Sequence, residues 1–104
     1  MNKGSYYKMR TKKWFEKKGY FTDYLEKSQR IFTKGKVIFI KRDVAGADGL
    51  AMNEKEIIFW QSKLNSENIA SAIKEFHKFP YPSFIQRWIV VWTIRAKEPQ
   101  IVEI

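Results

Sequence analysis

Three polar residues, Asp48, Gln61 and Lys63, have the side-chain chemistry of a metal-dependent hydrolytic site. Carboxylate and amide oxygens are hard ligands of the kind that Mg²⁺ prefers, and Mg²⁺ keeps several waters in such sites. A lysine beside the ion could orient or deprotonate the attacking water, or neutralise charge that develops on a phosphate. The ion itself would polarise the phosphate and lower the pKa of its water. These residue types predict metal-assisted hydrolysis of a phosphodiester, with Mg²⁺ or Mn²⁺ as the cofactor.

The spacing of the three residues indicates how strands could bring them together. Gln61 and Lys63 are two residues apart in an apolar run (EIIFWQSKL, residues 56–64), so on a strand their side chains share one face. If this run forms a hairpin with the segment before it, with residues 53–56 as the loop, Asp48 lies opposite Gln61. Directly opposed residues of a hairpin share a face and lie about 5 Å apart. This register predicts that the three side chains converge, whereas a slip by one residue would move Asp48 to the other face.

Each of these residues also has a simpler interpretation. Asp48 stands close to glycines on both sides, where Asp is a common turn residue. Lys63 could be a solvated charge at the end of a strand. Asp43, five residues before Asp48, is a candidate further metal ligand, and it also fits a strand-end residue beside Arg42. The combination of Asp48, Gln61 and Lys63 on neighbouring segments is what favours a metal site.

The pattern resembles the PD-(D/E)XK nuclease superfamily, which has the restriction-endonuclease-like fold. The resemblance rests on Asp48 in VAGADGLAM, a polar turn, and IIFWQSK, followed by a helical and then a hydrophobic strand pattern. It covers nearly the whole chain, including a basic helix at the start. By position, Asp48 matches the motif aspartate, Gln61 the second acidic position and Lys63 the lysine. Ala47 stands where the motif has proline, and Gln61 removes one negative charge from the metal site.

This resemblance implies a small, divalent-metal-dependent DNA endonuclease, similar to archaeal-type Holliday junction resolvases. It further implies a homodimer that acts on branched or duplex DNA, from a prokaryotic cell or a virus, in the cytoplasm of that cell or of the infected host. The alternative on the same fold is a catalytically inactive nucleic-acid-binding protein, in which Gln61 marks a lost metal site. A third hypothesis is a protein–protein adaptor whose basic half meets an acidic partner.

The charge of the chain is concentrated in its first half. Residues 1–42 hold thirteen of the twenty Lys and Arg and only three of the eleven Asp and Glu, a net charge of +10, whereas residues 43–104 carry −1. Such an excess in a small domain predicts a positive surface that suits a polyanion. Aromatic residues are interleaved with the basic ones, as in many nucleic-acid-binding surfaces. The alternative is that the excess lysine only keeps an aromatic-rich protein in solution.

Basic residues of the first half are therefore predicted to contact the DNA backbone, with an affinity that falls steeply as salt rises. The compact size favours recognition of DNA shape over base sequence. The predicted contact residues are Arg10, Lys12, Lys13, Lys17, Arg30, Lys34, Lys36 and Arg42.

The elements that must position these residues can be outlined from the sequence. Strong helix formers between Ser5 and Gly19 predict a helix over 5–18. An apolar stripe predicts a second helix over 67–78. Apolar and β-branched runs predict strands over 20–27, 37–41, 48–52, 56–64, 87–97 and 100–104. The predicted order is α-β-β-β-β-α-β-β, a mixed β-sheet flanked by helices in the α/β or α+β class.

Composition bounds the remaining possibilities. With 104 residues the chain is long enough for one domain, which we place at 1–104. The sequence has no Cys and a single His, which excludes disulfides, thiolate zinc sites and multi-histidine metal sites. No apolar run approaches the length of a membrane helix, so we expect no membrane partner.

Overall fold

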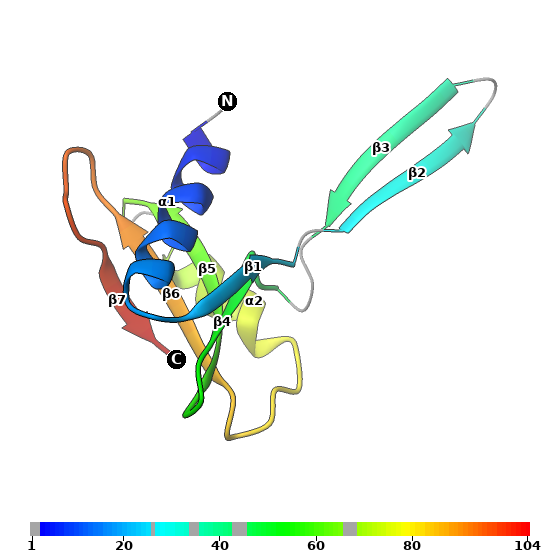
Figure 1. The fold of residues 1–104 in the computed structure, drawn as a ribbon. Helices are drawn as coiled ribbons and strands as arrows, with labels where there is room; N and C mark the ends of the chain where they lie inside the picture. Colours follow the sequence, from blue (N-terminus) through cyan, green and yellow to red (C-terminus); the bar gives the residue numbers. More distant parts are fainter. Residues whose placement is uncertain (1–2, 26, 34–35, 43–45, 66–68) are drawn as a thin grey trace.

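The computed structural model describes residues 3–25, 27–33, 36–42, 46–65 and 69–104, with side chains described over 5–25, 46–65 and 69–104. The elements are α1 (Lys3–Lys17), β1 (Phe21–Tyr24), β2 (Lys27–Thr33), β3 (Lys36–Arg42), β4 (Gly49–Met52), β5 (Ile57–Leu64), α2 (Ile69–His77), β6 (Gln86–Trp92) and β7 (Gln100–Glu103). Five strands form one open mixed sheet in the order β1-β4-β5-β6-β7, and β2 pairs with β3 in a second, two-stranded sheet (Figure 1). This is a mixed α+β fold. Within the described residues, neither helix is long and apolar enough to cross a membrane.

The β4–β5 hairpin has the predicted register. Met52 pairs with Ile57 and Leu50 with Phe59, around a loop of residues 53–56. The side-chain oxygen of Asn53 accepts hydrogen bonds from the two backbone N–H groups of residues 55 and 56, at 2.8 and 2.9 Å. This arrangement is a common way for Asn to close a tight turn. Beyond α2 the chain returns in β6, parallel to β5, and β7 forms the predicted edge strand.

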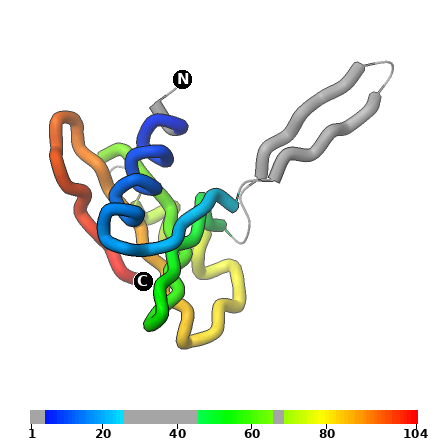
Figure 2. The backbone as a smooth tube through the Cα atoms, viewed as in Figure 1, coloured from blue at the N-terminus to red at the C-terminus, as the bar shows by residue number. Residues whose placement is uncertain are grey.

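The two helices cover opposite faces of the five-stranded sheet. Val90 and Val91 are neighbours on β6, so their side chains leave opposite faces. Val90 packs in a core with Phe15 of α1, and Val91 packs in a second core with Phe76 of α2. The five-stranded sheet therefore has a hydrophobic core on each side, and Figure 2 shows the chain leaving α1 and turning into the sheet.

Helix α1 ends at Lys17, and Gly19 terminates it, as the sequence predicts. Gly19 has φ of 91°, a left-handed conformation that glycine adopts without a steric cost. Its N–H donates to the Glu16 carbonyl at 3.1 Å, and the N–H of Tyr20 donates to the Phe15 carbonyl at 3.1 Å. The rings of Phe15 and Tyr20 lie 5.4 Å apart, which supplies the apolar contact typical of this helix ending.

The predicted order of elements was wrong by one strand. The pattern over 20–27 was interpreted as a single strand, whereas β1 ends at Tyr24 and β2 begins at Lys27. β2 has the sequence KSQRIFT, in which the two large apolar residues are adjacent. Strand prediction relies on alternation of polar and apolar residues or on an apolar run. This segment has neither signal, so its sequence does not indicate a strand. The observed order is α-β-β-β-β-β-α-β-β.

A buried hydroxyl joins α1 to β6. Thr11 is fully buried and its hydroxyl donates to the Tyr7 carbonyl at 2.8 Å. The same oxygen accepts from the indole N–H of Trp92 at 2.8 Å. We expect Thr11→Val to lower the free energy of unfolding by about 1–3 kcal/mol, because it leaves the buried indole N–H unsatisfied. Chemical denaturation measures this value.

The control for Thr11→Val is a double-mutant cycle with Trp92→Phe. In that background the donor is already gone, so Thr11→Val is expected to cost clearly less than it does in the wild type. An equal cost in both backgrounds would show that the hydroxyl does not act through Trp92.

Candidate functional site

The predicted site lies where strands β4 and β5 part. Their pairing ends with Gly49 opposite Trp60, whereas β5 continues to Leu64 and keeps its pairing with β6. We call this opening the fork; it comprises residues 46–49 on one side and 61–64 on the other. Backbone groups that face such an opening need partners other than a neighbouring strand. Side chains supply them here.

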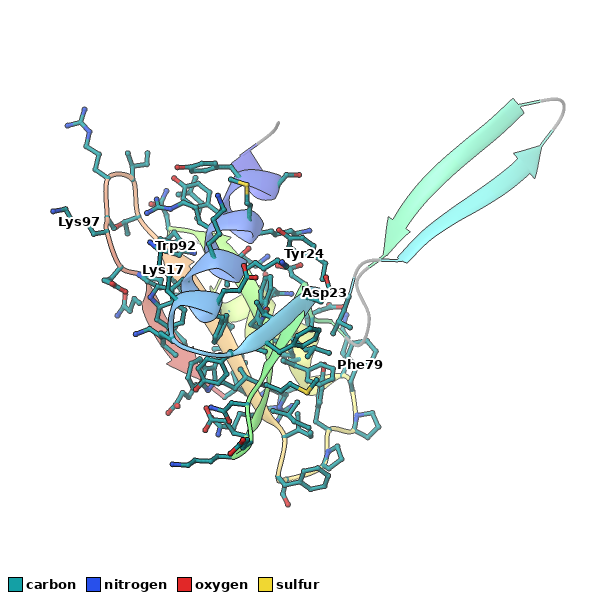
Figure 3. All side chains as sticks on the ribbon, in the orientation of Figure 1. Lys17, Asp23, Tyr24, Phe79, Trp92 and Lys97 are labelled. Carbon is teal, nitrogen blue, oxygen red and sulfur yellow. The ribbon has the colours of Figure 1, made fainter. Side chains whose placement is uncertain are left out.

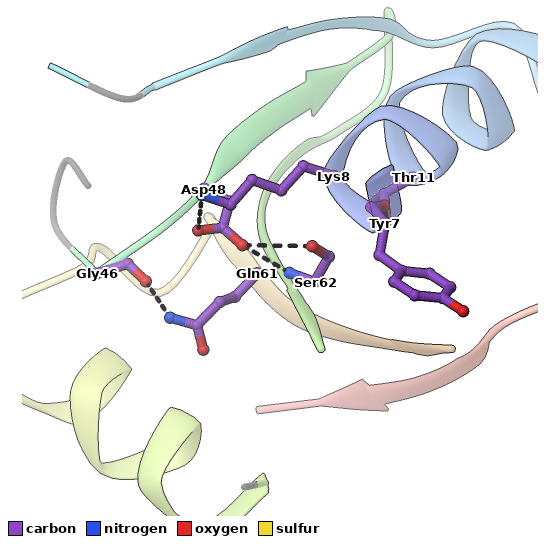
Figure 4. A network of polar contacts seen from close by, with 7 residues as sticks. All are labelled: Tyr7, Lys8, Thr11, Gly46, Asp48, Gln61 and Ser62. Carbon is purple, nitrogen blue, oxygen red and sulfur yellow. Dashed lines mark hydrogen bonds and ion pairs between the residues drawn. The ribbon is translucent and has the colours of Figure 1, made fainter. Parts of the chain in front are cut away.

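The Asp48 carboxylate lies in the fork. Asp48 is 4% exposed, and its backbone N–H still donates to the Trp60 carbonyl at 2.9 Å. Its Oδ2 accepts the backbone N–H of Ser62 at 2.9 Å and the Ser62 hydroxyl at 3.5 Å (Figure 4). The carboxylate therefore accepts a backbone N–H of β5 that a neighbouring strand would otherwise accept. A charged acceptor of this kind makes stronger hydrogen bonds than a neutral one.

Gln61 reaches across the same fork in the opposite direction. Its Nε2 donates to the Gly46 carbonyl at 2.8 Å (Figure 4). Gly46 has φ of 77°, a conformation that favours glycine at this turn. Gln61 is 6% exposed, and its Oε1 is buried without a hydrogen-bond partner among the described residues. A buried oxygen without a partner is costly and calls for an explanation.

Lys63 lies on the face of the sheet that Gln61 also occupies. Gln61 pairs with Ile89 and Lys63 with Val91, and both partners belong to the core on the α2 side. Ser62, which holds the Asp48 carboxylate, pairs with Val90 in the core on the α1 side. The structure thus brings Asp48 and Gln61 to one fork, but on opposite faces of the sheet. The Asp48 carboxylate lies with Ser62 and Lys8 on the α1 side, whereas Gln61 and Lys63 lie on the α2 side. Among the described contacts, the structure does not bring Lys63 against the Asp48 carboxylate. The predicted convergence of the three side chains on one face is therefore wrong.

A further residue of the site, Lys8 of α1, was not predicted as such. Its Nζ lies 3.6 Å from Oδ1 of Asp48 (Figure 4), and its side chain is 27% exposed. Lys8 follows Tyr7, which begins the buried stripe that continues with Thr11 and Phe15. That stripe could have indicated that Lys8 borders the sheet. The resemblance implied a basic helix beside the site, but no local pattern identifies Asp48 as the partner of Lys8.

The predicted DNA-binding residues of α1 divide into two groups. The Arg10 guanidinium donates to the Ala96 carbonyl at 3.0 Å and lies 4.3 Å from the centre of the Trp92 ring, so it helps to hold α1 on the sheet. Lys12 forms an ion pair with Glu16 at 3.6 Å. Lys13 and Lys17 are exposed, and Figure 3 shows Lys17 on α1. The side chains of Arg30, Lys34, Lys36, Arg42 and Asp43 lie outside the described part of the chain.

A second polar network centres on Glu56, at the start of β5. Its carboxylate accepts from the Tyr20 hydroxyl at 2.6 Å and from the Gln86 amide at 3.1 Å. The side-chain oxygen Oε1 of Gln86 in turn accepts the indole N–H of Trp88 at 3.0 Å. One carboxylate thereby fixes two aromatic side chains that come from different parts of the chain.

This network predicts a measurable pH effect. The hydrogen bond to Glu56, then burial and then repulsion by its charge, raises the pKa of Tyr20 from 10.0 to about 12. The folded state holds this proton more tightly than the unfolded chain, so the stabilisation is complete below pH 10 and is lost as pH rises to about 12. We expect Glu56→Gln to lower the pKa of Tyr20 toward 10, as measured by NMR of labelled tyrosines.

Tyr81 is the internal control for this titration. Burial raises its pKa to about 12 as well, against the lowering effect of Arg87, and Glu56 is not among the causes. Glu56→Gln should therefore leave the pKa of Tyr81 in place. If the pKa of Tyr20 stayed at about 12 in Glu56→Gln, the hydrogen bond to Glu56 would not be the cause of its rise.

Within the described residues, no group of three or more His, Asp or Glu side chains could hold a metal ion. Of the predicted metal ligands, Asp48 and Gln61 lie at the fork. Comparisons with protein families, with curated proteins and with solved structures find no match for this chain.

Proposed function

We propose that this protein is a divalent-metal-dependent DNA endonuclease with a restriction-endonuclease-like fold. The observation that carries the proposal is that a buried carboxylate and a buried amide oxygen, which has no partner among the described residues, lie at one strand fork. The two groups lie on opposite faces of the sheet, so one ion would bind both only after Gln61 turned its amide toward the Asp48 carboxylate. Asp48 and Gln61 reach this fork from opposite strands. A cation would give the Gln61 oxygen the partner that it lacks among the described residues.

The donor set fits Mg²⁺ or Mn²⁺. Both ions accept carboxylate and carbonyl oxygens, and Mg²⁺ is usually bound by one or two protein carboxylates together with waters and substrate phosphates. A site with Asp48 and Gln61 is of this kind, with one negative charge from the protein. When bound, the ion would supply Lewis-acid polarisation of the phosphate and a more acidic water.

The roles of the chain's own residues follow from their positions. The backbone N–H of Ser62 donates to the Asp48 carboxylate at 2.9 Å. This carboxylate, the proposed metal ligand, is therefore ordered before substrate binds. Lys63, on the face of Gln61, would neutralise charge that develops on the phosphate. The exposed lysines of α1 would bind the phosphate backbone without reading sequence.

The resemblance to Holliday junction resolvases suggests which DNA is the substrate and how many chains form the active enzyme. We propose branched or duplex DNA as the substrate and a homodimer as the active form, because two forks related by two-fold symmetry would cut two strands.

A cleavage assay tests the proposal. Labelled four-way junction and linear duplex are incubated with the protein in Mg²⁺, in Mn²⁺ and in EDTA. We expect nicking in either metal, none in EDTA, and loss of nicking in Lys63→Ala. The matched control is Lys55→Ala, which removes the same charge from the exposed β4–β5 loop. Absence of cleavage in both metals, or cleavage that persists in EDTA, would reject the nuclease.

A second candidate is the inactive nucleic-acid-binding protein. The observation that favours it is the ion pair between Lys8 and Asp48, in which an ammonium group neutralises the carboxylate that a metal would need. In this case the basic residues would still bind DNA, and salt would weaken the binding. Binding without cleavage in every metal would support this candidate.

The ion pair yields a prediction that separates the two candidates. If the protein is a nuclease, Lys8 competes with the cation for Asp48. Lys8→Gln should then lower the Mg²⁺ concentration for half-maximal cleavage by about fivefold, for a charge interaction of about 1 kcal/mol. Lys12→Gln is the matched control, since Lys12 pairs with Glu16. An unchanged or higher Mg²⁺ requirement in Lys8→Gln would count against competition.

A further inference from the structure

An aromatic cavity lies on the α1 side of the sheet, separate from the fork. It has a volume of about 640 Å³. Its walls come from the end of α1, the segment that follows it, β6 and the edge strand β7. The residues that line it are Trp14, Lys18, Tyr20, Trp88, Ile101 and Glu103.

The three aromatic walls are held in place from outside the cavity. The indole N–H of Trp14 donates to Glu98, and Tyr20 and Trp88 are held through the Glu56 network described above. Behind them, the Phe15 ring contacts all three, with ring centres 5.0–5.9 Å apart. Because their polar atoms are already bonded, the rings can offer apolar faces to a ligand. Because the rings are already fixed, ordering them costs little entropy when a ligand binds.

Charge indicates which ligand would suit these rings. The ammonium group of Lys18 lies 4.7 Å from the centre of the Trp14 ring, at an exposed position. A cation at the mouth of an aromatic cavity disfavours a cationic ligand and favours one that carries a phosphate. Glu103, which also lines the cavity, is an acceptor for the amino group of a base. A flat aromatic group joined to a phosphate is a nucleotide.

The position of the cavity relates it to the fork. Trp14 is six residues beyond Lys8 on α1, a separation of about 9 Å along the helix axis. This is about three base steps of a DNA strand. The side chains of Lys8 and Trp14 point about 120° apart around the helix, so a DNA strand would have to wrap partly around α1 to contact both the fork and the cavity.

We propose that this cavity binds one unpaired nucleotide of the DNA, with its base stacked on the aromatic rings and its phosphate at Lys18. The proposal rests on the proposed function in that it places DNA along α1, and it deepens that function by naming substrates with unpaired bases. Base–aromatic stacking of this kind is tolerant of sequence, so a bulge, gap or flap would be selected without a base code.

The test is carried out in EDTA, so that no cleavage is involved. A duplex with 2-aminopurine as a single unpaired base is compared with the same duplex fully paired. We expect quenching of the unpaired 2-aminopurine on saturation, and about tenfold tighter binding of the bulged duplex, from one stacking contact. Trp14→Leu and Lys18→Ala should each remove most of this preference. Lys13→Ala, an exposed residue of the same helix, should weaken both complexes equally.

Three outcomes decide the proposal. Quenching by the wild type that is lost in Trp14→Leu, with Lys18→Ala as the variant that leaves the aromatic packing intact, supports it. Equal affinity for both duplexes with no quenching overturns it, even if the protein cleaves DNA in Mg²⁺. Quenching and preference in a protein that never cleaves would uphold the cavity and reject only the nuclease.

Discussion

Asp48→Asn is expected to abolish metal-dependent cleavage while the protein stays folded. The amide has the size of the carboxylate and can still accept the Ser62 N–H, which now meets Oδ2 at 2.9 Å. It lacks the negative charge that a divalent cation requires. Because such a cation supplies several kcal/mol of transition-state stabilisation, the single-turnover rate in Mg²⁺ should fall by about 10³-fold or more.

The matched control is Asp23→Asn, the same chemical change on β1. Asp23 is exposed, and its carboxylate accepts only the neighbouring Tyr24 N–H among the described contacts. This variant should cleave at the wild-type rate. If Asp48→Asn also cleaved at the wild-type rate, Asp48 would be a structural residue of the fork and no metal ligand.

Gly49→Ala is expected to have the largest effect on stability. A Cβ at this position would collide with the buried Trp60 ring and would lie 2.7 Å from the backbone oxygen of Asp23. Neither a core indole nor a strand backbone can move cheaply. We expect a loss of about 3 kcal/mol or more in the free energy of unfolding, which corresponds to a melting temperature lower by roughly 12 °C or more.

Gly19→Ala provides the comparison for this substitution. No atom lies within 4 Å of a Cβ at residue 19, so the loss of stability in Gly19→Ala comes from the left-handed φ of 91° alone. That loss is about 1 kcal/mol. Thermal unfolding of both variants separates the steric effect from the conformational one. Equal melting temperatures would mean that Trp60 and β1 can yield to the extra methyl group.

The sequence was sufficient to predict the hairpin at the centre of the sheet. The polar loop before β5 suggested the register, with residues 53–56 as the turn, and the pairing of Leu50 with Phe59 confirms it. The end of α1 was predicted from Gly19 for the same kind of local reason. In these places one residue type has one favourable conformation, so the local pattern is enough.

The arrangement around the carboxylate depended on packing between distant segments. Opposition of Asp48 and Gln61 across a regular ladder was expected, whereas the strands part and both side chains bind backbone across the gap. The approach of Lys8 depends on how α1 crosses the sheet. That crossing is set by the fit of Tyr7 and Phe15 among aromatic neighbours, which no local pattern encodes.

Binding of Mn²⁺ in the absence of DNA tests the metal site most directly. The signal of free Mn²⁺ in electron paramagnetic resonance is followed as protein is added, for the wild type, Asp48→Asn and Gln61→Leu. We predict one bound ion per chain in the wild type, and binding weaker by about tenfold or more in each variant, a loss of at least about 1.4 kcal/mol. A wild-type protein that leaves the signal of free Mn²⁺ unchanged, or an Asp48→Asn variant that binds as tightly as the wild type, would contradict the metal site.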